Sequence, residues 1–352
     1  MTHRDAHGEL VGRTGEILRL LVRMHIASCD PVGSRTLSKS IAGKLSPATI
    51  RNIMADLEEG GYLVQPHTSA GRVPSDKGYR FYVDTLNDAT RLSRADERMV
   101  DQLFGGSDTP EEIMASASRL LSTVSGNVGI VTAPPLASTQ MKHIEFMNLG
   151  DNRVLVIFVS RSGLLQKKVI RLQEGYSQEE LNRAGRMLVD RFTDKTLTEI
   201  RSELVRLMEE ERQLYDRMLH LLGAWKSTLD EEIEPAVSEV YVQGATNIVH
   251  QPEFADIERM RALFEMFEEK GRLVRILNAC IAADPAGAVK IAIGSELGAP
   301  SMRAFTAIVT TYAARDNTIG FLGIIGPTRM EYERGISIVG HLGRLMTQRI
   351  NA

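Results

Sequence analysis

The sequence has little of what marks several classes of protein. Its two cysteines, Cys29 and Cys280, lie far apart, so a disulfide scaffold or a cysteine-based metal site is not expected. The longest unbroken aliphatic and aromatic run covers only residues 154–159, and the first twenty residues lack the apolar centre of a signal peptide. We therefore expect a cytoplasmic protein with no membrane segment.

The chain also lacks a basic excess. Its 42 Lys and Arg residues face 45 Asp and Glu residues, which gives a net charge of −3, so any binding of nucleic acid has to come from a local surface. Hydrophobic residues (43%) and charged residues (25%) are present in the proportions of a globular protein. A length of 352 residues exceeds what one core usually holds, so we expect two or three domains.

The N-terminal region predicts three short helices. Apolar residues at helical spacing run from 17 to 24 and stop at Asp30-Pro31, and Ser34 is expected to cap a second helix. A third helix is expected between the N-cap Ser46 and Gly60. The second and third helices, joined by a turn at 43–45, predict a helix-turn-helix whose third helix enters the major groove of DNA.

The third helix is expected to turn Thr49, Arg51 and Asn52 outward near its N-terminus, together with Ala48 and Ala55. Arg and Asn can each form two hydrogen bonds to a purine base, and a Thr or Ala methyl group can contact thymine. A solvated Arg-Asn pair is the alternative, and it is the commoner case for an isolated helix. The segment that follows favours DNA: residues 62–64, a polar tip at 65–72 and an extended segment at 79–83 predict a hairpin, as in a winged helix.

This N-terminal unit is locally basic. Residues 33–82 contain seven basic residues, Arg35, Lys39, Lys44, Arg51, Arg72, Lys77 and Arg80, against four acidic ones, Asp56, Glu58, Glu59 and Asp76, which gives +3. We expect the hairpin tip to contact phosphates or the minor groove. The side chains predicted to contact DNA are Ser34, Arg35, Lys39, Thr49, Arg51, Asn52, His67, Thr68, Ser69, Arg72, Lys77 and Arg80.

The remaining chain mixes helices and strands without regular alternation, so we predict the α+β class. Few large apolar groups occur at 84–98, which favours a linker or an exposed helix. Three strands at 143–148, 153–160 and 165–172, separated by short turns, predict an antiparallel meander. The other expected helices are 111–124, 177–192, 197–229, 254–270, 272–282 and 332–350, and the other expected strands are 128–132, 239–243, 289–294, 304–312 and 318–325.

Two sets of strings resemble a known family. PVGS (31–34), SPATIRNIMADLEEGGYLVQPHTSAGRVP (46–74) and GYRFYVD (78–84) closely resemble the N-terminal domain of the HrcA family of bacterial heat-inducible transcription repressors. IGSE (293–296) and GIIGPTRMEYERG (323–335) are similar to a second signature of that family. The resemblance follows the whole chain in order, although residues 138–230 offer no such string.

The resemblance implies a winged-helix domain at 1–90, a GAF-like domain formed by 91–137 and 231–352, and a dimerising α+β domain inserted at 138–230. It also implies a homodimer that represses chaperone operons by binding an inverted-repeat operator in double-stranded DNA. Heating inactivates such a repressor, and the GroE chaperonin keeps it active. We expect the meander and the long helix at 197–229 to form the dimer interface, with packing inside one subunit as the alternative.

The sequence gives weak support to catalysis, so we predict that the chain is not an enzyme and needs no cofactor or metal. Its eight histidines show no convincing metal-binding pair. GFLGIIGP (320–327) could be a phosphate-binding loop, but no Lys-Ser/Thr follows it and a buried strand is favoured. Arg329, Glu331 and Arg334 could contact a ligand, join domains or lie in solvent. A metabolite-sensing winged-helix regulator is the rival hypothesis, and a catalytic region tethered to DNA is a weaker third.

Overall fold

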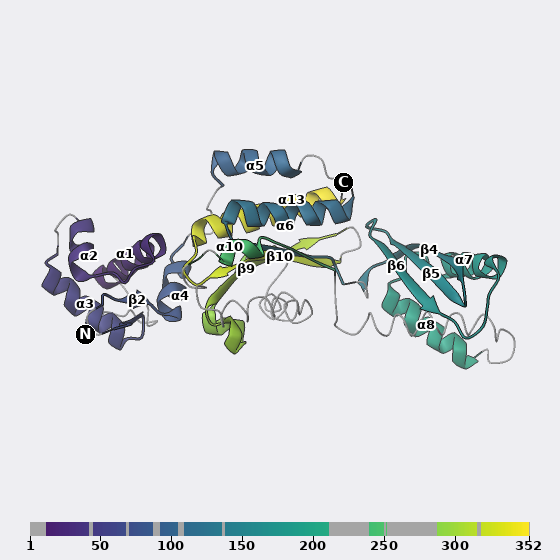
Figure 1. Cartoon of the computed structure of the whole chain (residues 1–352), viewed down its shortest axis with the longest axis horizontal. Helices are drawn as coiled ribbons and strands as arrows, with labels where there is room; N and C mark the ends of the chain where they lie inside the picture. Colours follow the sequence, from purple (N-terminus) through teal and green to yellow (C-terminus); the bar gives the residue numbers. More distant parts are fainter. Residues whose placement is uncertain are drawn as a thin grey trace.

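The computed structural model describes residues 12–41, 45–67, 70–86, 92–104, 109–135, 138–210, 239–249, 251, 287–314 and 318–351. These residues form an elongated α+β structure, which confirms the predicted class (Figure 1). An N-terminal unit lies at one end, a five-stranded sheet with two long helices lies in the middle, and a three-stranded sheet lies at the other end. Among the described helices, none is long and apolar enough to cross a bilayer.

The N-terminal unit contains the three predicted helices and a short hairpin. Its elements are α1 (Arg13–Ser28), α2 (Ser34–Ser40), α3 (Pro47–Glu59), β1 (Leu63–Val64), β2 (Val73–Pro74) and α4 (Asp76–Asp84). The Ser46 hydroxyl accepts a hydrogen bond from the Thr49 N–H at 3.1 Å, which confirms the predicted cap of α3. The predicted cap at Ser34 is wrong, because Gly33 occupies that position and Ser34 is the first helical residue.

The predicted second strand of the hairpin, at 79–83, is also wrong. That segment belongs to α4, because the Ser75 hydroxyl caps a helix by accepting a hydrogen bond from the Gly78 N–H at 3.2 Å. The buried residues of α4 are Gly78, Tyr79, Tyr82 and Val83, which is the spacing of one helix face and not of a strand. The strand that pairs with β1 is the shorter β2, in antiparallel register.

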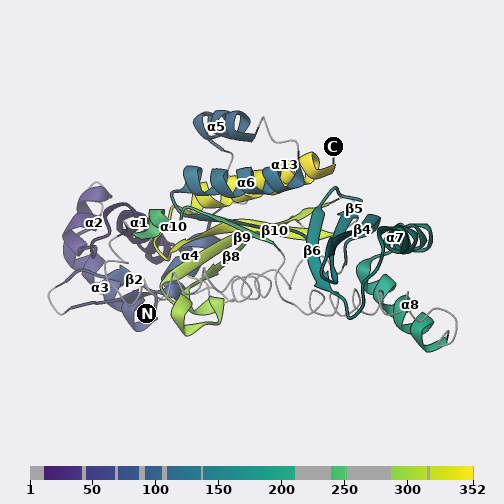
Figure 2. The same cartoon turned by 45° about the vertical axis from the view of Figure 1, so that its right-hand side comes forward.

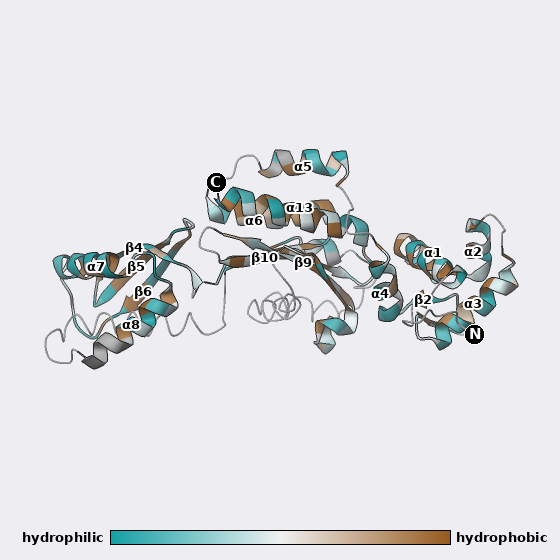
Figure 3. Cartoon of the chain, turned by 180° about the vertical axis from the view of Figure 1, so that it is seen from behind, coloured by the Kyte–Doolittle hydropathy of each residue, from teal (hydrophilic) through white to brown (hydrophobic). Residues whose placement is uncertain are grey.

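The middle unit is built around an antiparallel sheet in the order β7-β3-β10-β9-β8. Its elements are α5 (Arg94–Phe104), α6 (Pro110–Ser125), β3 (Val128–Thr132), β7 (Val240–Gln243), α10 (Ala245–Val249), β8 (Lys290–Ile293), η3 (Gly294–Leu297), η4 (Pro300–Met302), β9 (Phe305–Ala313), β10 (Ile319–Pro327) and α13 (Tyr332–Asn351). Helices α6 and α13 lie side by side on one face of this sheet (Figure 2). Coloured by hydropathy, β9, β10 and α13 carry many apolar residues (Figure 3).

Close packing in this unit depends on glycines. A Cβ atom at Gly129 of β3 would lie 2.1 Å from the Ser118 carbonyl oxygen of α6, so only glycine allows the helix to approach the strand this closely. Along β10, a Cβ atom at Gly323 would lie 2.3 Å from the Ile308 carbonyl oxygen of β9. The segment 320–327 is therefore the predicted buried strand, and its glycines serve packing.

The third unit is the predicted meander, formed by β4 (Met141–Gly150), β5 (Arg153–Ser160) and β6 (Leu165–Arg171). Asp151 and Asn152 make the tight turn between β4 and β5, with φ angles of 53° and 57°. Helices α7 (Gln178–Phe192) and α8 (Leu197–Glu210) follow, and together with the sheet they form a separate hydrophobic core. The expected helices at 254–270 and 272–282, and the part of the long helix beyond 210, lie outside the described residues.

Candidate nucleic-acid interface

The third helix presents two different faces. Ile50, Met54 and Leu57 are buried, in one hydrophobic core with residues of α1 and α2. The opposite side of its N-terminal half exposes Thr49, Arg51 and Asn52, as predicted. The Thr49 and Ser46 hydroxyl groups lie 2.9 Å apart in a hydrogen bond within the cap, which leaves the Thr49 methyl group as the part best suited to a base.

The second helix packs against α3 and adds positive charge beside it. Arg35 and Lys39 are exposed, whereas Ser34 is half-buried at the start of α2. The structure thus places the exposed cations Arg35, Lys39 and Arg51 on two helices that pack against each other.

The hairpin tip includes the predicted DNA contact His67. His67 is exposed, and its carbonyl oxygen accepts a hydrogen bond from the Ala70 N–H at 2.9 Å, which closes a turn at the tip. The predicted contacts Thr68 and Ser69 lie outside the described residues.

Arg72 is engaged inside the N-terminal unit. Its guanidinium donates to the Glu58 carboxylate of α3 through Nε at 2.8 Å and lies 2.7 Å from the same oxygen through Nη2, and its side chain is only 18% exposed. Its main chain bonds to Val32 in both directions, at 2.9 and 3.0 Å. This position favours a structural role, in which Arg72 ties the hairpin to α3.

Lys77 and Arg80 of α4 are engaged too. The Lys77 ammonium donates to the Gly60 carbonyl oxygen at 2.8 Å and lies 4.3 Å from the centre of the Tyr62 ring. Arg80 forms a two-pronged ion pair with Glu296, which is far away in the sequence. Burial alone would raise the pKa of Glu296, but hydrogen bonds from Arg80 and from the Ile293 N–H outweigh it and lower that pKa.

Sequence reasoning missed how the N-terminal unit and the sheet meet. Arg329 donates to the Ile26 carbonyl oxygen of α1 at 3.1 Å, and Arg334 of α13 pairs with Asp96 of α5 at 2.7 Å. Burial would raise the pKa of Asp96, but the hydrogen bonds from Arg334 and Ser93 lower it. Arg329 thus joins the middle unit to the N-terminal unit, as in the alternative of a contact between domains, whereas Arg334 pairs within the middle unit and Glu331 is exposed. Each partner is remote in sequence, so no local pattern could reveal it.

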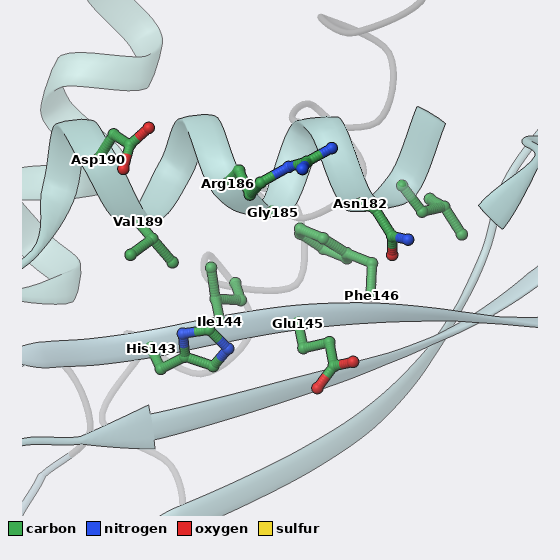
Figure 4. A pocket seen from close by; sticks show the side chains of 10 residues that line it. His143, Ile144, Glu145, Phe146, Asn182, Gly185, Arg186, Val189 and Asp190 are labelled. Atoms are coloured by element: carbon green, nitrogen blue, oxygen red, sulfur yellow. The ribbon is translucent and has the colours of Figure 1, made fainter. Parts of the chain in front are cut away.

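Two cavities are lined by described residues. One of about 330 Å³ lies between α1, α4 and the start of α13, with Arg23, Tyr82 and Glu331 on its walls. The other, of about 420 Å³, lies between β4 and α7. There Ile144 and Phe146 point toward α7, while His143 and Glu145 point away from it (Figure 4). Within the described part of the chain, no group of three His, Cys, Asp or Glu residues is placed to hold a metal ion.

An exposed helix start with Thr49, Arg51 and Asn52, beside a second helix that carries cations, is the surface that DNA-binding proteins of the helix-turn-helix class present. A family model described as the HrcA protein C-terminal domain matches residues 111–336. Together with the relatives described below, this match shows that the chain belongs to the HrcA family.

Three curated relatives are each named heat-inducible transcription repressor HrcA. The protein from Geobacter sulfurreducens is 41% identical over 334 residues, which are 94% of this chain and 96% of the relative. The protein from Syntrophobacter fumaroxidans is 35% identical over 97% of both chains, and that from Shouchella clausii is 34% identical over 95% of this chain and 96% of the relative. These names favour repression over the metabolite-sensing alternative.

A solved structure shares the fold. The crystal structure of a hypothetical protein, determined at 2.2 Å resolution, matches with a TM-score of 0.62 at 20% identity and covers 97% of this chain and 99% of that chain. This likeness supports the arrangement of the elements.

Proposed function

We propose that this chain represses heat-shock genes by binding an inverted-repeat operator in double-stranded DNA as a cytoplasmic homodimer. The observation that carries the proposal is the exposed N-terminal half of α3, where Thr49, Arg51 and Asn52 lie beside the cations of α2. In this proposal residues 1–90 are a winged-helix domain, with α3 in the major groove and the tip around His67 near the backbone.

The middle unit is proposed to be a GAF-like domain made from residues 91–137 and 231–352. The strand order supports this assignment, because β3 lies between β7 and β10 and pairs with both. The chain leaves the sheet after β3, forms the meander with its separate core, and returns to β7. Residues 138–230 would accordingly be an insertion, since the five-stranded sheet needs strands from both sides of it.

The outer face of the meander supports dimerisation through this insertion. Ile144, Phe146 and Val156 face α7 and α8, so alternate residues point outward. Seven of the outward residues are apolar: Met147, Leu149, Leu155, Ile157, Val159, Leu165 and Val169. The other five are polar or charged: His143, Glu145, Arg153, Lys167 and Arg171. Met147, Leu149, Leu165 and Val169 are 40–53% exposed. Exposed apolar residues gathered among charged ones on one face support an interaction site, and a two-fold partner would present the same face.

A charge on this face tests the dimer. We expect Val169→Glu to convert the dimer to a monomer in sedimentation experiments and to weaken operator binding, because each interface would bury two carboxylates. Val169→Ala is the matched control, since it shortens the side chain without adding charge. An unchanged dimer in Val169→Glu would place the interface elsewhere.

DNA binding is tested by selection. The full-length chain is offered a pool of random duplexes, and the DNA upstream of its own coding sequence is footprinted. We expect an inverted repeat to be enriched and protected. Enrichment of no sequence over successive rounds would refute the proposal.

Regulation by heat needs only a modest free-energy change. A loss of about 1–2 kcal/mol raises the unfolded fraction of a marginally stable protein about 5- to 30-fold, and partial unfolding would expose apolar surface that the GroE chaperonin can bind. Operator affinity should therefore fall after mild heating and recover when chaperonin is added. Equal affinity before and after both treatments would show that neither acts on this chain.

A further inference from the structure

Helix α4 is fixed to the N-terminal unit by one of its sides. The Ser75 N–H donates to the Tyr62 carbonyl oxygen at 3.1 Å, just before α4 begins. A Cβ atom at Gly78 would lie 2.3 Å from that same oxygen, so the helix touches the backbone that follows α3. Lys77 adds its bond to Gly60 at the end of α3. Because these contacts to the main chain at the end of α3 are close, we expect α4 and α3 to move as one rigid unit.

The other side of α4 binds the edge of the five-stranded sheet through polar groups. Arg80 donates to both carboxylate oxygens of Glu296 and, through Nη2, to the Ile291 carbonyl oxygen at 2.6 Å. One carboxylate oxygen of Asp76 accepts from the Ser295 N–H and from the Ser295 hydroxyl, each at 3.0 Å. We call Asp76, Arg80, Ser295 and Glu296 the clasp.

The clasp explains the string IGSE at the end of β8. Gly294 has a φ of +53°, and a Cβ atom there would lie 2.4 Å from the Asp76 carboxylate, so glycine is required for both reasons. The next residue, Ser295, supplies two donors, and Glu296 supplies the acceptor for Arg80. Gly294, Ser295 and Glu296 thus all serve to hold the turn after β8 against α4.

An apolar contact lies beside the clasp. Tyr79 and Tyr82 of α4 approach the ring of Tyr332 of α13, with centroid distances of 6.1 and 6.3 Å. Apolar burial is non-directional, so these rings hold the units together but tolerate rotation. A bidentate ion pair is directional, since the planar guanidinium must align with the carboxylate. The tyrosine rings therefore attach the N-terminal unit to the middle unit, and the ion pair fixes the angle between them.

We propose that the clasp orients the two DNA-binding units of the dimer and so sets the half-site spacing that the dimer accepts. This inference rests on the proposed function above. Two recognition helices can enter their half-sites together only when their separation and direction match the helical repeat of DNA. Each α3 is joined through α4 to the sheet, so angular freedom at the clasp becomes freedom in the position of α3. Asp76, Arg80, Ser295 and Glu296 are thus positioning residues that do not contact DNA.

The test uses full-length protein and the inverted repeat that wild type selects from random DNA. Duplexes are then made in which the spacing between half-sites changes by one base pair at a time. We expect wild type to prefer its selected spacing by about tenfold and Glu296→Gln to lower that ratio to about twofold, which are ordinary sizes for a coupling between sites. Affinity for random duplexes should not change.

Rescue separates orientation from general damage. Glu296 is 38% exposed and Gln has the same shape, so this variant should fold, as circular dichroism would verify. If Glu296→Gln does not fold, Arg80→Lys is used in its place, because lysine keeps the positive charge but cannot form the bidentate pair of a guanidinium. The exchanged pair, Arg80→Glu with Glu296→Arg, restores the ion pair but not the bonds to Ile291 and from Ile293, so it should restore the spacing preference in part. A folded variant that keeps the full wild-type ratio would overturn the inference, whereas failure of wild type to select DNA would overturn the proposed function instead.

Discussion

Arg51→Ala separates base recognition from general attraction to DNA. Arg51 is exposed on α3, so its removal should change the free energy of unfolding by less than about 0.5 kcal/mol. If its guanidinium forms two hydrogen bonds to a guanine, the loss costs roughly 1–3 kcal/mol per half-site and roughly 2–6 kcal/mol for the proposed dimer, or about 30-fold or more in operator affinity. Binding to random DNA should weaken little, because that binding comes from phosphate contacts.

The assay is a titration of operator and random duplexes over a series of salt concentrations. For Arg51→Ala we expect the ratio of the two affinities to fall while the salt dependence stays nearly constant. Arg183→Ala is the matched control, since Arg183 is an exposed arginine on α7 and the change in net charge is identical. Equal losses on both duplexes would refute base readout, because they would make Arg51 a phosphate contact.

Arg72→Ala provides the contrast within the same unit. The sequence alone suggests a uniform loss of DNA binding, but Arg72 is tied to Glu58 and largely covered. We expect this variant to lose about 1 kcal/mol of stability, as for other hydrogen-bonded charges, and to bind DNA more weakly in proportion to the unfolded fraction. If the variant kept full stability but bound every duplex more weakly, Arg72 would be a DNA contact.

Three further outcomes are expected from the packing, the carboxyl groups and the sheet edge. Gly129→Ala should lower the free energy of unfolding in urea by about 1–3 kcal/mol, because α6 must move away from β3, and no loss would contradict that close approach. Asp96 and Glu296 have lowered pKa values, so their stabilisation is present at neutral pH and is lost below about pH 4. Unfolding of Asp96→Asn in acid should therefore depend less on pH than that of wild type. Gly294→Ala should destabilise the protein through strain at positive φ. Gly33→Ala should not, because Gly33 has a negative φ and a Cβ atom there would meet only the Thr36 hydroxyl oxygen, at an ordinary contact distance of 3.9 Å.

Local signals in the sequence predicted most of the secondary structure. The Ser46-Pro47 start of α3 was predictable because a cap and a proline in the first turn satisfy the free N–H groups of a helix. The turn at Asp151-Asn152 was predictable because both residues tolerate positive φ. In each case the residues that encode the structure are neighbours in the chain.

Helix α4 shows where local signals fail. Its aromatic residues favour a strand by propensity, and a hairpin was already expected at that place in the chain. The helix forms because Tyr79, Tyr82 and Val83 share a face that α1 and α13 cover, and only the fold supplies those partners. Residues 84–98 were likewise predicted only as a linker or exposed helix, whereas α5 begins at Arg94 and continues beyond that range to Phe104, where it buries Val100 and Phe104.

The prediction of DNA contacts was limited in the same way, because some cations are paired with residues that are remote in the sequence. A sum over the sequence treats every cation in the N-terminal unit as available, yet Arg72 and Arg80 are neutralised by Glu58 and by a carboxylate 216 residues away. Arg35 and Arg51 are among the cations that remain exposed on the helices. In the proposed dimer two such units bind together, and the free energy of each half-site is realised only when both units are correctly oriented. A cation that does not contact DNA, such as Arg80, can then determine the affinity of the protein for its operator, because its ion pair decides whether the second unit can reach its half-site.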